Sequence, residues 1–382
     1  MARNRLATTD RDSLPPQLTR NLSREQLPAL DGLRAIAAYL VVFYHLGIPW
    51  IPGGLGVLAF FVLSGFLITW LLLREQESRG TVSLRLFYLR RALRIFPAFY
   101  VYAFGILLLL SLTGKRIVWA QTIASLCYVN NYYQAIAGDP GTALSHTWSL
   151  AIEEQFYLVA PAAFLALYRR GTLARRLVLA IGCVWICRWT LVAIGVPQHY
   201  IYEAFETRAD HLMIGCLLAV ALRGRLASGT FSAFCAHEAL PALTVGALVL
   251  SAMLGYRFGP TYRDVVGFVV DPLLVAVLIV QLIAWSDRTP WSWLDRPAIR
   301  YLGRISYSIY LYQQIMPTLV DAALRRQPVL ARLAVTLGGV TLAAGVSYQF
   351  VERPFLRLKE RLSRHPRAAP NPVVAPLSAT VP

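Results

Sequence analysis

Long apolar stretches, separated by short polar and basic segments, run along most of the chain. Several stretches reach the ~20 residues that an α-helix needs to cross the hydrocarbon core of a bilayer. The pattern predicts an all-α polytopic membrane protein with about ten transmembrane helices. We expect these helices over residues 31–50, 54–73, 95–113, 147–168, 177–196, 209–222, 239–256, 264–285, 300–320 and 330–351.

The remaining segments divide the chain into a membrane domain and two tails. Residues 1–28 are polar and basic, without the short apolar core of a cleavable signal sequence. Residues 29–356 are expected to form the membrane domain, and the proline-rich residues 357–382 a disordered cytoplasmic tail. Residues 118–135 are apolar, yet an extra crossing there would move four arginines at 169–176 to the outer side. We therefore expect that segment to lie on or re-enter the outer face.

Composition supports a membrane protein. The 382 residues are 57% hydrophobic, with 15% charged residues and a mean hydropathy of +0.51, whereas a soluble domain carries about 25% charged residues. The five cysteines form no Cys-x-x-Cys pattern and are interpreted as buried free thiols, and no metal site is expected.

The net charge of +17 is explained by membrane topology rather than by nucleic-acid binding. With the N-terminus inside, 27 lysines and arginines lie on the cytoplasmic side and six on the outer side. The positive-inside rule therefore predicts that both termini are cytoplasmic. The basic side would contact anionic membrane lipids.

The first predicted helix carries two costly polar residues on one face. Arg34 and His45 are eleven residues apart, which returns a helix to within ~20° of its starting direction, and Asp31 lies one turn before Arg34. Ionisable residues inside a membrane are a functional-site hypothesis by default. The functional interpretation makes His45 a general base; the alternative is a histidine hydrogen-bonded to a neighbouring helix.

Glycines follow this helix. Gly53, Gly54 and Gly56 would let the turn approach His45 closely, and Ser64 and Gly65 would loosen the second helix or expose a hydroxyl. Plain helix packing explains these residues equally well.

Arg91 and Arg94 share a helix face at the cytoplasmic mouth of the third predicted helix. Paired guanidiniums bind phosphate oxygens, which suggests a phosphate-bearing cytosolic donor. From these residues alone, positive-inside anchoring is the better explanation.

Two acids begin the fourth predicted helix. Glu153 and Glu154 follow Trp148 and Ser149, and because neighbouring side chains diverge by ~100°, at most one acid is expected to face a given site. Glu153 would orient His45 or bind a hydroxylated substrate, and Glu154 would face water. Electrostatics at a helix N-terminus would also favour acids there.

Polar residues recur in two later helices. Arg208 and Asp210 open the sixth predicted helix, and we expect them to pair with each other or with site groups. Tyr307 belongs to a polar, aromatic stripe on the ninth predicted helix.

Together these segments resemble the acyltransferase-3 family of bacterial membrane O-acyltransferases. The matching runs, in order across residues 28–355, are Leu30–Arg34 with His45, Phe60–Phe66, Arg91–Arg94, Trp148–Tyr157, Arg208 with Asp210, and Ser306–Leu311. The resemblance implies a ten-helix enzyme of the bacterial cytoplasmic (inner) membrane. Such an enzyme passes an acyl group, often acetyl, from acyl-CoA to a hydroxyl of a glycan on the far side.

The resemblance also implies roles for single residues. His45 matches the essential histidine, paired with Arg34; Glu153 matches the family's acid; Arg91 and Arg94 match the pair associated with acyl-CoA. Gln313 stands where many members have a histidine. No permanently bound cofactor and no appended secreted hydrolase-like domain are expected.

Three alternatives remain open. The acceptor could be a cell-surface or exported glycan, a lipid-linked sugar, or a macrolide or other small secreted metabolite. A proton-coupled transporter could use Arg34, His45, Glu153 and Asp210 as a relay, although the repeated halves typical of transporters are not evident. A non-catalytic helper of glycan assembly would have no need of these residues.

Overall fold

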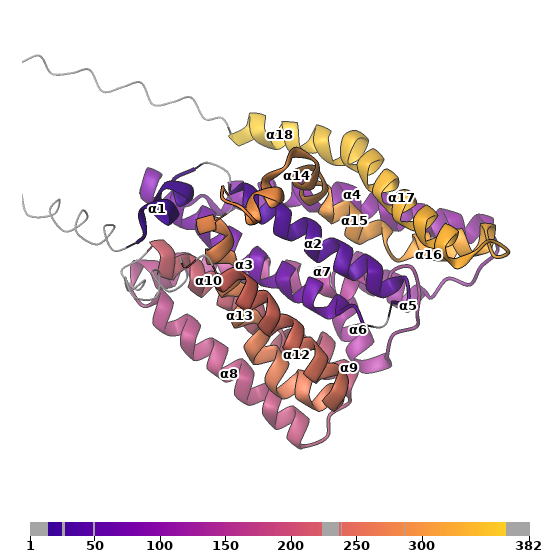
Figure 1. The fold of residues 1–382 in the computed structure, drawn as a ribbon, viewed down its shortest axis with the longest axis horizontal. Helices are drawn as coiled ribbons and strands as arrows, with labels where there is room; N and C mark the ends of the chain where they lie inside the picture. Colours follow the sequence, from indigo (N-terminus) through magenta and orange to yellow (C-terminus); the bar gives the residue numbers. More distant parts are fainter. Residues whose placement is uncertain are drawn as a thin grey trace, which may run out of the picture.

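A computed structural model describes residues 14–24, 27–48, 50–223, 237, 239–285 and 287–363. All regular secondary structure in these ranges is helical, which confirms the predicted all-α class (Figure 1). The helices are α1 Pro16–Leu22, α2 Pro28–His45, α3 Gly53–Arg79, α4 Leu84–Leu112, α5 Trp119–Leu126, α6 Asn130–Ala137, α7 Thr147–Arg169, α8 Leu173–Ala193, α9 Gln198–Glu203, α10 Ala209–Arg223, α12 Leu240–Tyr262, α13 Phe268–Trp285, α14 Pro297–Arg304, α15 Ser306–Tyr312, α16 Ile315–Ala323, α17 Val329–Ser347 and α18 Arg353–Ser363. Short 3₁₀ or π turns cover Phe205–Thr207, Arg263–Gly267, Trp291–Asp295 and Tyr348–Glu352.

Within the described ranges, six helical stretches are long and apolar enough to cross a membrane. They cover residues 53–79, 84–112, 147–169, 173–193, 240–285 and 329–362. The longest folds back at Gly259, where φ is +76° and Pro260 follows, so that α12 and α13 lie side by side (Figure 1). The multi-pass character is thus supported, while the count of about ten and the orientation stay predictions.

One predicted span is not a single helix. Residues 300–320 are divided among α14, α15 and α16. Pro317 lacks an N–H for the carbonyl of Gln313, and its ring would clash with that carbonyl in a continuous helix. The chain accordingly leaves the helix between Tyr312 and Ile315.

Other boundaries also differ from the prediction. Helix α4 begins at Leu84, so Arg91 and Arg94 lie inside a helix rather than at its mouth. Residues 357–363 of the predicted disordered tail are helical in α18, and residues 364–382 lie outside the described part of the chain. Residues 118–135, in contrast, agree with the prediction that no helix crosses the membrane there, because they form α5 and most of α6, two helices of eight residues each.

Helix α3 lies at the centre of the bundle and packs closely on α2 and α10 (Figure 1). A Cβ at Gly65 would collide with the backbone of Leu212, and one at Gly215 with the backbone of Val62. Gly65 therefore serves the contact between α3 and α10, and α3 continues through it without a break. Of the two interpretations offered above, helix packing explains this glycine.

Four cysteines lie in the described residues and all are free. Cys216 is buried, but Cys127 and Cys183 are exposed and Cys187 is half-buried, so the prediction that the thiols are buried fails for these three. Cys183 and Cys187 lie on α8, which has few buried residues and faces outward over most of its length. Cys235 lies outside the described residues.

Candidate active site

Three neighbouring cavities run through the bundle. The central cavity is small, about 70 Å³, and is lined by Arg34, Ser64, Arg91, Arg94 and Glu153 among others. The basic cavity, about 690 Å³, shares Arg91 and Arg94 with it. On its other side the His45 cavity, about 430 Å³, shares Val57 and Tyr310 with the central cavity. The shared walls place the three cavities in the order basic, central, His45.

His45 is the last residue of α2, and its ring lines the His45 cavity. Its Nδ1 lies 2.9 Å from the carbonyl oxygen of Val41. A carbonyl only accepts, so Nδ1 carries the proton in this contact and Nε2 of the neutral ring keeps its lone pair. The residue is exposed and stands edge-on to the Tyr44 ring at 5.3 Å. A neutral imidazole that lines an open cavity and keeps a lone pair on Nε2 is what a general base requires.

Arg34 and His45 line different cavities. Arg34 belongs to the central cavity, and its nearest carboxylate is Asp31, at 3.8 Å. Eleven helical residues separate the two along α2 by about 16 Å. The pairing that the resemblance implied is therefore not a contact between side chains, although both residues face the line of cavities.

Arg91 joins the two acids of α7. Its guanidinium lies 3.4 Å from Glu153 and 3.3 Å from Glu154, and sits 3.5 Å above the ring of Tyr157. Both carboxylates therefore contact one guanidinium, which corrects the expectation that Glu154 would face water, while only Glu153 lines the central cavity, as the helix geometry predicted. Glu154 is kept from water because the long Arg91 side chain bridges the ~100° between the two neighbouring positions.

Glu153 is held from three sides. Ser64 donates a hydrogen bond to it at 3.1 Å, Tyr157 donates another at 3.1 Å, and Arg91 completes the set. Ser64 lines the central cavity, and its hydroxyl serves there as a hydrogen-bond donor to Glu153. Glu153 makes no contact with His45, so the expectation that it orients the imidazole is not met.

Arg94 has a different environment from Arg91. It is half-buried and lines both the central and the basic cavities. It makes no hydrogen bond or ion pair with any described residue, whereas Arg90 is paired with Glu75 at 2.7 Å. Arg94 is thus the cation of this region available to an anionic ligand. Other basic residues that line the basic cavity are Arg74, Arg79, Arg90, Arg223 and Lys359.

The remaining predicted residues contribute to walls. Trp148 and Gly54 line the His45 cavity, and Ser149 lines the central one and contacts the hydroxyl of Tyr310. Tyr307 also lines the central cavity, where its hydroxyl donates to the carbonyl of Ile95 at 3.1 Å.

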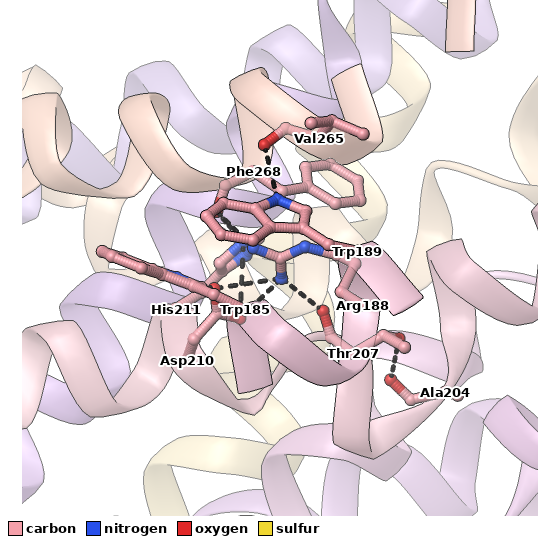
Figure 2. Close-up of polar contacts among 9 residues, drawn as sticks. All are labelled: Trp185, Arg188, Trp189, Ala204, Thr207, Asp210, His211, Val265 and Phe268. Atoms are coloured by element: carbon pink, nitrogen blue, oxygen red, sulfur yellow. Dashed lines mark hydrogen bonds and ion pairs between the residues drawn. The ribbon is translucent and has the colours of Figure 1, made fainter. Parts of the chain in front are cut away.

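Asp210 pairs with an arginine that the sequence analysis left out. Arg188 of α8 donates to both carboxylate oxygens of Asp210, at 3.0 and 3.1 Å, and also to the carbonyls of Thr207 and Phe268 (Figure 2). Both side chains are fully buried. The expected pair of Arg208 with Asp210 is therefore replaced by Arg188 with Asp210. Only the approach of α8 to α10 in the folded chain makes this pair.

Arg208 is buried among aromatic rings. Its guanidinium lies 3.9 Å from the centre of the Phe268 ring and 4.9 Å from that of Tyr202, with Phe61 and Trp148 within 6 Å. Its guanidinium nitrogens have no hydrogen-bond partner among the described residues. Cation–π attraction therefore replaces hydrogen bonding for this side chain. Because Tyr202 and Trp148 also line the His45 cavity, Arg208 braces that wall.

His146, directly before α7 and its acidic motif, is not among the residues predicted from the sequence. The ring is buried and stands edge-on to Tyr102 and Tyr310 in the wall of the His45 cavity. Burial lowers the pKa of His146 to about 3, so the ring is neutral at pH 7. Both ring nitrogens lack a partner among the described side chains and backbone. The signal in the sequence was a histidine directly before the helix that carries the acidic motif.

Glu203 is a second overlooked residue of the His45 cavity. It is 8% exposed, and burial, reinforced by Asp139, raises the pKa of its carboxyl to about 8. The side chain is therefore mostly protonated at pH 7. Gln313, in contrast, is buried with its amide unpartnered among the described residues, outside all three cavities.

The raised pKa of Glu203 predicts a pH-dependent stability. Between its unfolded value of 4.5 and about 8, the folded chain holds a proton that the unfolded chain lacks, so the free energy of unfolding falls as the pH rises. Glu203→Gln has no titratable carboxyl and therefore removes this loss of unfolding free energy at high pH. We expect its thermal midpoint to exceed the wild-type midpoint by roughly 5 °C at pH 9 and to match it at pH 4. Thermal unfolding in nanodiscs at both pH values measures the gap, and a gap independent of pH contradicts the assignment.

Comparisons with known proteins agree with one another. A family model described as an acyltransferase domain matches residues 27–348. The chain is 32% identical to peptidoglycan O-acetyltransferase OatA of Listeria monocytogenes, over 88% of this chain and 57% of that protein. It is 31% identical to YrhL of Bacillus subtilis, a candidate peptidoglycan O-acetyltransferase, over 86% and 54%. The chain thus spans just over half the length of these curated relatives. No solved structure matches it significantly.

Proposed function

The chain belongs to the acyltransferase-3 family, and from that premise we propose that it moves an acetyl group from acetyl-CoA to a hydroxyl of a cell-envelope glycan. The observation that carries the proposal is the line of three cavities, with unpaired Arg94 on one side and the lone pair of His45 on the other. The names of the relatives, which include peptidoglycan O-acetyltransferases, support the glycan acceptor.

The donor enters by the basic cavity. Coenzyme A carries several phosphates, and Arg94 together with the basic residues around it offers guanidiniums for them. By the positive-inside count this cavity faces the cytoplasm. The pantetheine arm would pass through the central cavity, which must widen to admit it, and would bring the thioester toward His45.

The chemical step occurs at the boundary between the central and His45 cavities. Nε2 of His45 takes the proton of the acceptor hydroxyl while that oxygen attacks the thioester carbonyl. The backbone amide of Gly54, in the first turn of α3, stabilises the resulting oxyanion, rather than Arg34, which lies about 16 Å from His45 along α2. The intermediate then expels the coenzyme A thiolate, which takes up the proton from His45, and leaves an acetyl ester on the acceptor.

The two acids have a structural part in this scheme. Glu153 and Glu154 hold Arg91 against Tyr157, and this fixes the wall on which the thioester would rest. The acceptor enters from the opposite side, where the aromatic rings of Trp148 and Tyr202 offer flat faces to a sugar. The two substrates therefore approach His45 from opposite sides of the bacterial cytoplasmic membrane.

Radiolabelled acetyl transfer tests the proposal. The purified protein in nanodiscs is given acetyl-CoA labelled in the acetyl group, together with cell-envelope glycan. We expect label to appear in the glycan as an ester released by mild alkali, with one coenzyme A formed per acetyl group. Consumption of the labelled acetyl-CoA without any glycan ester would reject the acceptor class. Absence of both signals would reject the acyltransferase assignment.

A further inference from the structure

A fourth, mostly apolar cavity opens beside the His45 cavity. This cavity, called here the α12 groove, has a volume of about 960 Å³ and lies between the turn that joins α2 to α3 and the helices α12 and α13. Trp50, Leu250 and Met253 line it, with 80%, 57% and 63% of their surfaces exposed. Since α12 belongs to a stretch that is long and apolar enough to cross a membrane, we expect the groove to open toward lipid.

The groove is continuous with the His45 cavity. Five residues line both spaces: Tyr44, Gly53, Gly54, Tyr202 and Arg263. The two glycines leave the junction open, because a Cβ at Gly54 would lie only 3.2 Å from the Tyr202 hydroxyl. A molecule in the groove would therefore reach the His45 cavity without leaving the membrane.

An arginine, Arg263, lies where the α12 groove meets the His45 cavity. Arg263 uses its Nε–H for Asp264 at 3.0 Å, and its guanidinium lies 4.7 Å from the centre of the Tyr202 ring. Its two terminal amino groups make no hydrogen bond with any described residue. Arg208 also lies 4.9 Å from the centre of the Tyr202 ring, but it is fully buried and lines neither space. Arg263 is thus the cation that lines both spaces, while Asp271 lines the groove and Asp139 and Glu203 line the His45 cavity.

We infer that the α12 groove binds the hydrocarbon chain of a lipid-carried acceptor, whose linking phosphate sits at Arg263 and whose sugar enters the His45 cavity. The inference rests on the proposed function and specifies its acceptor. The groove residues 249–257 cover about 12 Å along α12, enough for part of a long isoprenoid or acyl chain. A phosphate between chain and sugar matches the free amino groups at the junction.

The substrate test compares one sugar in two forms. The disaccharide unit of peptidoglycan is offered either as a soluble methyl glycoside or joined through a diphosphate to a long isoprenoid alcohol. We expect kcat/KM to be at least ~10-fold higher for the lipid-carried form. Met253→Trp fills the groove and should lower this preference about tenfold, and Arg263→Gln should raise the KM of the lipid-carried form alone. Leu243→Trp, at a similarly exposed position of α12 outside the groove, is the matched control and should retain the preference.

A binding test separates failure of the groove from failure of the proposed function. An isoprenoid diphosphate disaccharide with a photoreactive chain should label α12 in nanodiscs more strongly than photoreactive phosphatidylethanolamine, and Met253→Trp should reduce that labelling. Equal labelling by the two lipids, or equal use of the two acceptors, overturns the inference and marks the groove as an ordinary lipid-facing surface. Selective labelling without acetylation of either acceptor rejects the proposed function and leaves the groove as a binding site.

Discussion

His45→Gln is expected to lower kcat/KM for acetyl transfer by a factor of ~10²–10⁴. Glutamine keeps the polarity of the side chain and its ability to donate to the Val41 carbonyl, but it has no nitrogen lone pair that accepts a proton near neutral pH. Binding of acetyl-CoA should stay unchanged, because the donor's phosphates lie in the basic cavity. Single-turnover transfer and acetyl-CoA binding, measured on the same nanodisc preparation, separate the two effects.

His237→Gln is the matched control for this prediction. His237 is exposed and lies just before α12, away from the three cavities, so its replacement should leave transfer unaltered. Both variants should insert into the membrane and unfold at the wild-type temperature, since His45 is exposed. Transfer by His45→Gln at the wild-type rate would eliminate His45 as the base.

Arg91→Gln and Arg94→Gln are expected to fail for different reasons. Arg91 is the shared partner of Glu153 and Glu154, with an 18% exposed side chain. Its loss leaves two adjacent carboxylates without a cation, which should cost about 3 kcal/mol of stability and abolish transfer. A second substitution, Glu154→Gln, removes one of these charges and should restore part of the stability. Thermal unfolding of the single and double variants tests this coupling.

Arg94→Gln should unfold like the wild type, because Arg94 has no hydrogen-bond or ion-pair partner among the described residues. Loss of a charge-assisted contact to phosphate should raise the KM for acetyl-CoA by about 10–100-fold. The KM for S-acetyl-pantetheine, which has the thioester and no nucleotide phosphates, should not change. An equal rise in both KM values would assign Arg94 to the thioester end instead. Destabilisation of Arg94→Gln but not of Arg91→Gln would reverse the two roles.

Local sequence features identified several residues that the structure places together. The spacing of Arg34 and His45 on one helical face holds in α2, because α-helical geometry fixes direction over three turns. The arginine and acid motifs, 62 residues apart between Arg91 and Glu153, meet as an ion pair in the central cavity. Short motifs within one helix can be interpreted from the sequence, because helix geometry determines which of their side chains share a face.

Contacts between helices were harder to predict. The pair of Arg188 with Asp210 required the packing of α8 on α10, and neither the 22-residue spacing nor the local sequence indicates it. Bridging of both acids by Arg91 depended on the length of one side chain reaching from α4 to α7. The break between α15 and α16 followed from Pro317, whose effect a hydropathy pattern does not record.

By itself, the sequence determined the all-α membrane class and the family, and it predicted which helices hold the candidate site residues, since apolar length and short motifs are local properties of the chain. Only the tertiary structure decided that His45 and Arg94 face different cavities on one line, that Gly65 serves packing, and that His146 and Glu203 join the site. Cavities and buried ion pairs form between helices distant in sequence. Their residues are therefore selected by how the helices pack, and no periodicity along one helix encodes that choice.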